Sequence, residues 1–379
     1  MTAASTPSVT NSQPGANTAV LDFPLHPNPS PVSAEERARI LAAPGFGKHF
    51  TDHMARATWS ADRGWHDSRV EAYGPLQLDP ATAVLHYAQE IFEGLKAYRH
   101  ADGTIWTFRP QANAARFARS ARRLALPELP EQAFIASLEA LVQADAAWVP
   151  DAGEASLYLR PFMFASEVFL GVRPSALVDY LVIASPAGAY FPGDVRPVSI
   201  WLSQEYTRAA PGGTGAAKCG GNYAASLLPQ QEATAHGCDQ VVFLDAVEHR
   251  WVEELGGMNL YFVMDDGEVV TPQLSGSILE GVTRLSVLQI AADLGHRVTE
   301  RKVDIDEWRE GVASGRIAEV FACGTAAVVT PVGALVEPDR TSVANEGETG
   351  PVTAKIRQAL MDIQYGRAED VHGWLHRLA

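Results

Sequence analysis

The sequence predicts an α/β or α+β protein of two domains. Three observations support this prediction: the length of 379 residues, the mixture of strand-like and helix-like segments in both halves, and a loop-like segment between the halves. At about 150 residues per domain, this length suggests two domains. Ala187-Gly-Ala-Tyr-Phe-Pro-Gly-Asp194 is rich in turn-forming residues and marks the boundary. We expect a flexible tail over 1–32, a smaller N-terminal α/β domain over 33–191, an interdomain loop and domain entry over 192–206, and a larger C-terminal domain over 207–379.

Capping, proline and turn signals place the elements of the first half. Ser33-Ala-Glu-Glu36 has the form of a capping box, which starts a short helix, and Pro110 can occupy the first position of another. Apolar residues at helical spacing predict a third helix. Asp102-Gly103 is a turn dipeptide that predicts a hairpin. The expected elements are a helix over 33–41, a strand, a short helix and a hairpin over 68–110, helices over 110–124 and 131–149, and buried strands over 157–162 and 178–184.

Strands and helices also alternate in the second half. A glycine-rich loop over 212–221 precedes a helix that ends near residue 235, in which we expect Pro229 to cause a kink. Asp265-Asp266-Gly267 predicts the turn of a hairpin. The remaining expected elements are strands over 198–202, 241–245, 259–264, 269–271, 319–323 and 326–330, and helices over 282–294 and 352–363.

The composition excludes several classes of function. The net charge of −15 argues against nucleic acid as the main partner, because phosphate binding needs a basic surface. No apolar run approaches the roughly 18 residues of a membrane span, so we expect no membrane insertion. Cys219, Cys238 and Cys323 form no zinc or disulfide pattern, which fits a reducing compartment. The segment 1–20 lacks charged side chains and an apolar core, so we expect a tail and not a signal peptide.

Lysine is rare in this chain, and one lysine has unusual neighbours. Only five of the 30 basic residues are lysines, and lysine is the basic residue that can lose its proton and act as a nucleophile. Lys218 lies in a loop of glycine and alanine that has neither Walker A nor dinucleotide-fingerprint spacing. These small neighbours leave space for a planar partner, and a lysine shielded from water can form a Schiff base. The alternative is a flexible surface loop with a solvated lysine, which local composition alone favours.

Two further segments place charge in a strand. Glu253 and Glu254 lie beside glycines at the start of a strand, where a carboxylate could bind a protonated ring nitrogen. A solvated approach to a hairpin is the commoner structure for such a segment. Tyr158 and Arg160 lie two apart on a predicted strand and therefore face the same side. An arginine in an apolar strand needs an anionic partner, either a substrate carboxylate or an internal Asp or Glu.

Groups that could bind anions occur at three other places. The arginine run over 109–123 is mainly a solvated face, although one member could hold a phosphate. Gly324-Thr-Ala-Ala327 is a tight turn whose N–H groups could bind an anion, and Gly281-Val-Thr283 offers the same chemistry at a helix start. Both could also be ordinary turns. The pairs His49/His53 and His372/His376 have no carboxylate in register, so we expect no metal site.

Together these segments resemble the branched-chain amino acid aminotransferases, which are fold-type IV enzymes that use pyridoxal 5′-phosphate (PLP). The resemblance covers about residues 46–373, and its seven blocks occur in the family's order at near-family spacing. It implies a D-amino acid aminotransferase-like fold of two domains, with PLP bound in the C-terminal domain. The blocks are Phe50-Thr-Asp-His-Met54, Leu85-His-Tyr-Ala-Gln-Glu-Ile-Phe-Glu-Gly94, Tyr158-Leu-Arg-Pro161, Gly188-Ala-Tyr-Phe-Pro192, Lys218-Cys-Gly-Gly-Asn-Tyr223, Glu254-Leu-Gly-Gly-Met-Asn259 and Gly324-Thr-Ala-Ala327.

The resemblance implies how the cofactor is held. Lys218 is similar to the lysine that binds PLP covalently and later carries a proton between Cα and C4′. Tyr223 is similar to the tyrosine that binds the phenolic oxygen of PLP. Glu254 is similar to the carboxylate that keeps the pyridine nitrogen protonated, so that the ring can accept electrons. The implied phosphate contacts are Arg116, Val282, Thr283 and Thr325.

The resemblance also implies a substrate pocket. Arg160 is similar to the group that receives the distal carboxylate of glutamate. The turn of Thr325, Ala326 and Ala327 is similar to the one that binds the α-carboxylate. An aromatic wall with an arginine and tyrosines at its rim can accept both an apolar branched side chain and a charged one. The implied aromatic residues are Phe46, Tyr87, Phe92, Tyr158 and Tyr190.

The activity that the resemblance implies is ping-pong transamination, in which L-leucine, L-isoleucine or L-valine donates its amino group and 2-oxoglutarate becomes L-glutamate. It also implies a homodimer in which Tyr87 is the candidate for the residue that reaches the partner's site, and the cysteine usage leads us to expect a cytoplasmic location. A D-amino acid aminotransferase or an aminodeoxychorismate lyase would share the fold, whereas a non-catalytic small-molecule binding protein would hold no cofactor. Ala327 and Thr330 stand where some members carry two cysteines, so we expect no thiol switch. Gly257 stands where some relatives have threonine.

Overall fold

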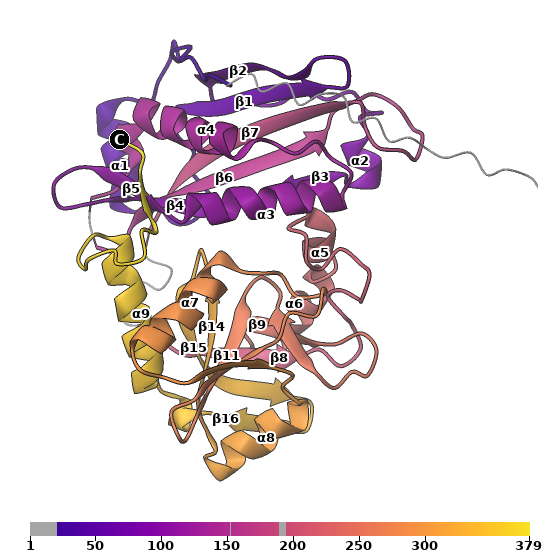
Figure 1. Cartoon of the computed structure of the whole chain (residues 1–379), viewed down its shortest axis with the longest axis vertical. Helices are drawn as coiled ribbons and strands as arrows, with labels where there is room; N and C mark the ends of the chain where they lie inside the picture. Colours follow the sequence, from indigo (N-terminus) through magenta and orange to yellow (C-terminus); the bar gives the residue numbers. More distant parts are fainter. Residues whose placement is uncertain (1–20, 152, 189–194) are drawn as a thin grey trace, which may run out of the picture.

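The computed structural model describes residues 21–151, 153–188 and 195–379, which form two sheets with helices around each (Figure 1). The first sheet has eight strands, in the order β17-β5-β4-β6-β7-β1-β2 with β3 paired to β6. All of these pairs are antiparallel. The strands are β1 (His53–Ser60), β2 (Gly64–Ala72), β3 (Glu90–Phe92), β4 (Leu95–Arg99), β5 (Ile105–Phe108), β6 (Ser156–Ala165), β7 (Leu177–Ala187) and β17 (Leu375–Arg377).

The second sheet is mixed and has nine strands among the described residues, in the order β10-β9-β8-β15-β14-β11-β12-β13 with β16 paired to β15. β8 is parallel to β9 and β15, and β12 is parallel to β13. β10 also pairs with β11 at Glu254 and Asn259, so the sheet closes on itself at a predicted site residue. The strands are β8 (Val198–Leu202), β9 (Gln240–Leu244), β10 (Val252–Leu255), β11 (Asn259–Met264), β12 (Val269–Pro272), β13 (Val298–Arg301), β14 (Ile317–Gly324), β15 (Val328–Glu337) and β16 (Arg340–Val343).

Helices pack against both sheets, and the short helix α5 lies where the two halves meet (Figure 1). α3 and α4 lie on the first sheet, α7 and α9 pack on each other beside β14 and β15, and α5 contacts β3. The helices are α1 (Ala34–Ala42), α2 (Val84–Tyr87), α3 (Pro110–Arg123), α4 (Glu131–Ala144), α5 (Gly220–Ala224), α6 (Leu227–Ala235), α7 (Val282–Asp293), α8 (Ile305–Ser314) and α9 (Pro351–Gln364).

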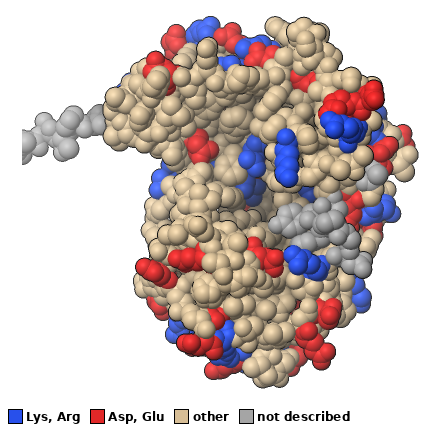
Figure 2. All heavy atoms as spheres, turned by 180° about the vertical axis from the view of Figure 1, so that it is seen from behind, with Lys and Arg blue, Asp and Glu red and all other residues tan. Residues whose placement is uncertain are grey.

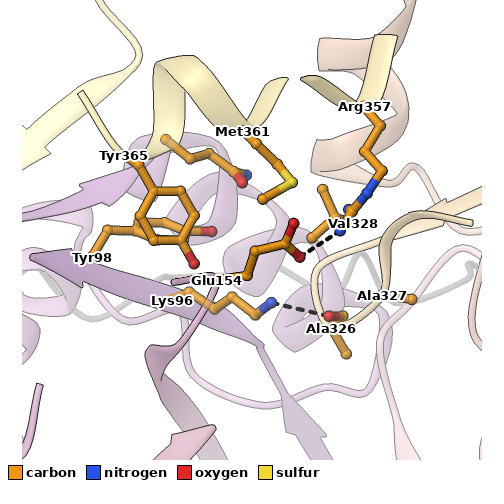
Figure 3. Close-up of a pocket in the computed structure, with 10 residues that line it drawn as sticks. Lys96, Tyr98, Glu154, Ala326, Ala327, Val328, Arg357, Met361 and Tyr365 are labelled. Carbon is orange, nitrogen blue, oxygen red and sulfur yellow. Dashed lines mark hydrogen bonds and ion pairs between the residues drawn. The ribbon is translucent and has the colours of Figure 1, made fainter. Parts of the chain in front are cut away.

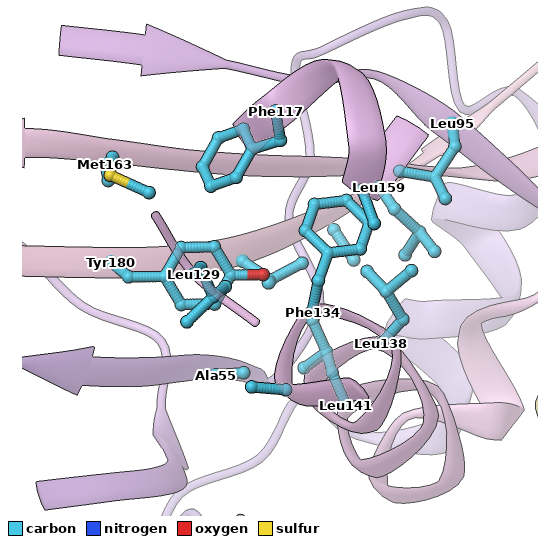
Figure 4. Close-up of a cluster of buried hydrophobic side chains, with 14 of the residues drawn as sticks. Ala55, Leu95, Phe117, Leu129, Phe134, Leu138, Leu141, Leu159, Met163 and Tyr180 are labelled. Atoms are coloured by element: carbon cyan, nitrogen blue, oxygen red, sulfur yellow. The ribbon is translucent and has the colours of Figure 1, made fainter. Parts of the chain in front are cut away.

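The first core lies between the sheet and the pair α3 and α4 (Figure 4). Phe117 of α3 and Phe134 of α4 are buried, with ring centroids 5.5 Å apart, and Phe117 also meets Tyr180 of β7 edge-on at 5.8 Å. The Tyr180 hydroxyl is buried but contacts Ser137 Oγ at 2.8 Å, which satisfies its polar atom. This packing fixes α3, which carries the predicted phosphate-binding arginine, against the sheet.

The predicted α/β class and most predicted elements are confirmed. Ser33 caps α1, because its Oγ accepts from the N–H of Glu36 at 3.2 Å. The hairpin predicted at Asp102-Gly103 joins β4 to β5, with Arg99 opposite Ile105. The last strand, β17, pairs with β5, so the C-terminal segment returns to the first sheet. Residues 189–194, which hold most of the predicted boundary segment, lie outside the described residues, as does the tail over 1–20.

Two predicted helices are wrong in extent. The helix expected over 131–149 ends at Ala144, because Asp145 turns inward and its carboxylate accepts from the backbone N–H of His53 at 2.9 Å and contacts its ring Nδ1 at 2.7 Å. The helix expected after the glycine-rich loop breaks into α5 and α6 at 225–226. Pro229 does not cause the break, since it lies in the first turn of α6, where a missing N–H is tolerated.

The sequence did not predict the elements β1, β3, β13, β16, β17 and α8. Apart from β1, which has eight residues, these strands have only three or four residues each, too few for a pattern of alternation. α8 had a usable signal, since the Asp304 side chain accepts from the N–H of Asp306 at 3.0 Å and Glu307 follows in the first turn. Among the described residues, no helix is long and apolar enough to cross a membrane.

Candidate active site

The glycine-rich loop with Lys218 lies between the two sheets. The N–H of Lys218 donates to Ser120 Oγ on α3 at 2.9 Å, and the Lys218 carbonyl accepts from the N–H of Phe92 on β3 at 3.0 Å. Seen from behind, the surface is hollowed between the two halves, and Lys and Arg side chains lie along the upper edge of the hollow (Figure 2). These two contacts hold Lys218 against α3 and β3, so the alternative of a flexible surface loop with a solvated lysine is wrong.

Close packing explains why this loop consists of small residues. A Cβ added at Gly215 would collide with the backbone of Ser277, and one added at Gly220 would collide with the carboxylate of Glu90. That carboxylate accepts from the N–H of Gly220, and burial raises the pKa of Glu90. Only glycine permits such approaches of one backbone to another group.

The amine of Lys218 meets a phenol and two aromatic faces. Lys218 Nζ donates to the hydroxyl of Tyr223 on α5 at 2.6 Å. The amine also lies 4.8 Å from the ring centroid of Phe92, and the Phe92 and Tyr223 rings lie 4.9 Å apart. Three predicted site residues thus come together around one nucleophilic atom.

The structure distinguishes the two candidate carboxylates of β10. Adjacent strand residues face opposite sides, and Glu253 accepts from serines while Glu254 accepts from the N–H of Leu279 at 2.8 Å and from Asn259 Nδ2 at 3.4 Å. Arg208 donates to Glu254 through Nε at 3.0 Å and also through Nη2. Burial raises the pKa of Glu254 to about 7, although the charge of Arg208 opposes that rise.

Arg116 is held by a carboxylate that the sequence reasoning missed. Its Nε and Nη2 donate to the two oxygens of Glu93 at 2.7 and 2.8 Å, and Glu93 is 0% exposed. Asn113 Nδ2 adds a further bond to Glu93 at 2.7 Å. Burial would raise the pKa of Glu93, but the charge and hydrogen bonds of Arg116 lower it overall. The pair is therefore ionised, and Glu93 fixes the direction of the guanidinium.

The Arg116 guanidinium lies at the start of α7. Its Nη1 donates to the carbonyl of Glu280 at 3.1 Å, two residues before α7 begins at Val282. Val282 and Thr283 are buried in the first turn of this helix, where unpaired N–H groups favour an anion. Thr325 joins the same region, because its hydroxyl donates to the Gly94 carbonyl at 3.2 Å. The four predicted phosphate contacts are therefore brought together.

Three of the predicted substrate residues line a cavity on the first sheet. The cavity has a volume of about 220 Å³ and is bordered by Phe46, Tyr158 and Arg160. Arg160 Nη2 donates to the Tyr158 hydroxyl at 3.0 Å, and the guanidinium lies 4.8 Å from the Phe92 ring centroid. Among the described residues, Arg160 forms no ion pair, and its buried Nε has no hydrogen-bond partner. A carboxylate from a ligand would complete this group.

Four predicted substrate residues in the described part of the chain do not border this cavity, namely Tyr87, Phe92, Ala326 and Ala327. Tyr87 on α2 is 38% exposed, and its hydroxyl donates to the carbonyl of Leu170. Tyr190 lies outside the described residues. The histidines have structural contacts instead of a shared site, since His53 binds Asp145 and His372 contacts Asp293 at 2.6 Å.

Glu93 and Arg208 are the functional residues that sequence reasoning missed. Glu93 belongs to a quoted family block, and its position beside Gly94 was a usable signal. For Arg208 we find no local signal in the sequence, because its partner Glu254 lies 46 residues away. Together with Lys218 they complete a site that fits PLP. The Lys218 amine fits the aldehyde, the Glu254 carboxylate fits the ring nitrogen, and the start of α7 beside Arg116 fits the phosphate.

Comparison with known protein families gives one match. Residues 90–335 match the family described as amino-transferase class IV. This segment contains β3, the glycine-rich loop, β10, the start of α7 and the turn between β14 and β15, and thus the residues around Lys218 described above.

The chain also resembles named proteins over most of its length. It is 60% identical, over 94% of the chain and 98% of the relative, to a probable branched-chain-amino-acid aminotransferase of Streptomyces coelicolor. A branched-chain-amino-acid aminotransferase of Mycolicibacterium smegmatis is 58% identical over 96% of this chain and 100% of its own.

Solved structures agree with these relatives. The branched-chain amino acid aminotransferase of Escherichia coli has a TM-score of 0.71 and 30% identity, covering 86% of this chain and 100% of its own. The T.th. enzyme of the same name, complexed with N-(5′-phosphopyridoxyl)-L-glutamate, has a TM-score of 0.69 and 31% identity, covering 86% of this chain and 99% of its own.

Replacing Glu93 by glutamine should destabilise the protein strongly, because the Arg116 charge would stay buried without its carboxylate. We expect the free energy of unfolding to fall by about 3–5 kcal/mol, measured by urea denaturation. The matched control is Glu128→Gln, which removes one partner of an exposed pair with Arg122 and should change stability by less than about 1 kcal/mol. Equal effects of the two substitutions would contradict the assigned role of Glu93.

Proposed function

The chain belongs to the class IV aminotransferase family, and from this premise we propose that it transfers the amino group of L-leucine, L-isoleucine or L-valine to 2-oxoglutarate. The products are the branched 2-oxo acids and L-glutamate, and the cofactor is PLP. The family, the fold-type IV fold, the activity and the cofactor expected from the sequence are all confirmed by the relatives and their ligands. The D-amino acid aminotransferase, aminodeoxychorismate lyase and binding-protein alternatives are not favoured.

One observation carries the assignment of the site: Lys218 Nζ lies 2.6 Å from the Tyr223 hydroxyl, inside a loop that close packing keeps free of large side chains. A lysine amine in hydrogen-bond contact with a phenol is a nucleophile with a partner for its proton. The carboxylate of Glu254 and the Arg116 guanidinium lie on two other elements, β10 and α3. We assign the reacting amine to Lys218 on this geometry.

When bound, PLP supplies the electron-accepting ring that allows the Cα–H bond of an amino acid to break. Lys218 would hold the cofactor and would carry the proton between two carbon atoms, since its amine lies in the site and its backbone is fixed by Ser120 and Phe92. Glu254 would hold the ring nitrogen in its protonated form. Arg116 and the first turn of α7 would bind the phosphate, and Tyr223 would bind the phenolic oxygen.

The cavity at Arg160 suits two kinds of substrate side chain. Phe46 and Tyr158 contact edge to face, with centroids 5.1 Å apart, and offer an apolar wall to a branched chain. The distal carboxylate of glutamate would bind the Arg160 guanidinium, which among the described residues has no carboxylate partner. The α-carboxylate would bind the turn of Thr325, Ala326 and Ala327. Tyr190 remains a predicted member of this pocket.

We also propose that the protein is a homodimer. α2 and the segment 166–174 form one exposed apolar patch, with Leu170 63% and Val172 88% exposed. The hydroxyl of Tyr87 on α2 donates to the carbonyl of Leu170, which holds the two parts of the patch together. Patches of this kind mark interaction sites, and the patch includes Tyr87, the residue expected to reach the partner's site. A cytoplasmic location is a further proposal, and the free cysteines suit it.

Borohydride reduction of the purified protein should attach the cofactor to the peptide that contains Lys218, and mass spectrometry identifies that peptide. Lys218→Ala should keep the fold but lower leucine transamination by several orders of magnitude, because the covalent step is lost. Lys355→Ala, on an exposed face of α9, is the control and should leave turnover unchanged. A label on another lysine, or normal turnover in Lys218→Ala, would refute the assignment.

The affinity of the apoprotein for PLP should fall as the pH is lowered through 7. Burial raises the pKa of Glu254 to about 7, so the carboxyl group is ionised above this pH and neutral below it. A neutral carboxyl cannot hold a protonated ring nitrogen, so we expect about tenfold weaker binding at pH 6 than at pH 8. The Glu254→Gln variant is the control, because pH effects that arise from PLP itself change the affinity of both proteins equally. Parallel pH profiles of the two proteins would contradict the role of Glu254.

Charges introduced into the exposed patch should dissociate the dimer. The double variant Leu170→Asp/Val172→Asp should elute as a monomer in size-exclusion chromatography with light scattering, since burying two carboxylates at an apolar interface is costly. Val247→Asp, at a valine that is 73% exposed elsewhere, should remain dimeric. A native protein that is monomeric, or a double variant that stays dimeric, would show that this patch is not the interface.

A further inference from the structure

A small polar cluster lies directly behind the turn between β14 and β15, and the proposed function gives it no role (Figure 3). It surrounds a cavity of about 10 Å³ that is too small for a substrate. Lys96 of β4 is 7% exposed there, and Arg357 of α9 donates to Glu154 at 2.5 Å. Because Glu154 pairs with Arg357, a different contact must explain why the ammonium of Lys96 is buried.

The Lys96 ammonium binds the turn itself. Its Nζ donates to the carbonyl of Ala326 at 2.9 Å, a contact that joins β4 of the first sheet to the turn of the second (Figure 3). The neighbouring residue Thr325 is also held from the first sheet, by its bond to the carbonyl of Gly94. One contact comes from β4 itself, and the other comes from Gly94, directly before this strand.

The bond from Lys96 to the Ala326 carbonyl determines the direction of the N–H in the same peptide group. The described peptide bonds are trans, and in a trans peptide the C=O and N–H groups point in opposite directions. Since the carbonyl of Ala326 faces Lys96, the N–H of Ala327 faces away from it. Among the described residues, no hydrogen-bond acceptor contacts this N–H. This N–H is therefore left without a protein acceptor at the turn that is proposed to bind the α-carboxylate.

The backbone at this turn is held in an unfavourable conformation. Val328, the next residue, has a φ of 61°, which is rare for any residue except glycine and especially for a β-branched one. Strain of this kind persists only where the surroundings hold it, and it concentrates at functional sites. The bonds from Lys96 and to Gly94 supply such support.

The charges around Lys96 leave its ammonium as the group that titrates near neutral pH. Burial and the charge of Arg357 lower the pKa of Lys96 to about 8, while Glu154 opposes this. Burial raises the pKa values of Tyr98 and Tyr365, the other titratable groups that face it, so both stay neutral. At pH 7 the cluster thus holds the Arg357–Glu154 pair and a charged Lys96.

We propose that Lys96 is a positioning residue for the substrate α-carboxylate, acting through the peptide group between Ala326 and Ala327. The ammonium polarises this peptide from behind, so that the Ala327 N–H becomes a stronger donor toward a carboxylate in front of it. Lys96 does not touch the substrate. This inference rests on the proposed function, which places the α-carboxylate at the turn.

Calorimetric titration of the holoenzyme with two deaminated analogues of leucine tests this role. 4-Methylvalerate carries a carboxylate, and 4-methylpentanamide has the same shape without charge. In Lys96→Met, the Kd of the carboxylate should rise about tenfold relative to that of the amide, since a charge-assisted interaction is lost. Lys355→Met, at an exposed lysine of α9, should match the native protein. Lys96→Gln serves as a second variant if Lys96→Met melts below the assay temperature.

The pH profile gives a readout that a purely structural lysine would not produce. In the native protein, the preference for the carboxylate over the amide should fall as the pH rises through about 8, because Lys96 then loses its proton. In Lys96→Met the preference should be smaller and should not change across this range. A variant with the native preference and the native pH profile would overturn the proposal. If the native holoenzyme binds neither analogue, the failure lies in the proposed function instead.

Discussion

The buried ion pair of Arg116 and Glu93 is the interaction on which the site depends. Glu93 lies between β3 and β4, Arg116 lies on α3, and the free end of the guanidinium contacts the residues before α7. Three elements from both halves of the molecule are therefore fixed by one pair of charges. Burying such a pair costs free energy, and removing one of its partners costs more. The pair is useful here because it makes the arginine present its remaining N–H groups to an anion in one direction.

This arrangement also explains why an acidic protein can bind acidic ligands. The net charge of −15 acts over the whole surface and is screened by salt. By contrast, three cations of the site are each aimed by a different partner: Arg116 by a carboxylate, Arg160 by a phenol and Lys96 by a carbonyl. Local geometry, and not the net charge, therefore decides which anions are bound. For the same reason, the small number of lysines indicated more about the site than the net charge did.

Local patterns predicted the elements well, but not the contacts between them. The capping box at Ser33 and the turn at Asp102-Gly103 act within a few residues, so the sequence alone defined them. The end of α4 was missed because it depends on His53, which lies 92 residues from Asp145. Of the site, the residues that carry family blocks could be predicted, whereas Arg208 could not, because its role follows from the closure of the second sheet at Glu254.

The segment from Glu90 to Lys96 shows how a short stretch of chain can organise a site between two sheets. Glu90 accepts from the N–H of Gly220, Phe92 faces the amine of Lys218, Glu93 fixes Arg116, and Lys96 holds the turn at Ala326. Gly94 has to lack a side chain, because a Cβ there would collide with the Tyr158 hydroxyl. Since the same rigid segment contacts the loop of the amine, the phosphate-binding arginine and the carboxylate-binding turn, the distances among these groups are set by the first sheet. A displacement of this segment would therefore disturb cofactor and substrate binding together.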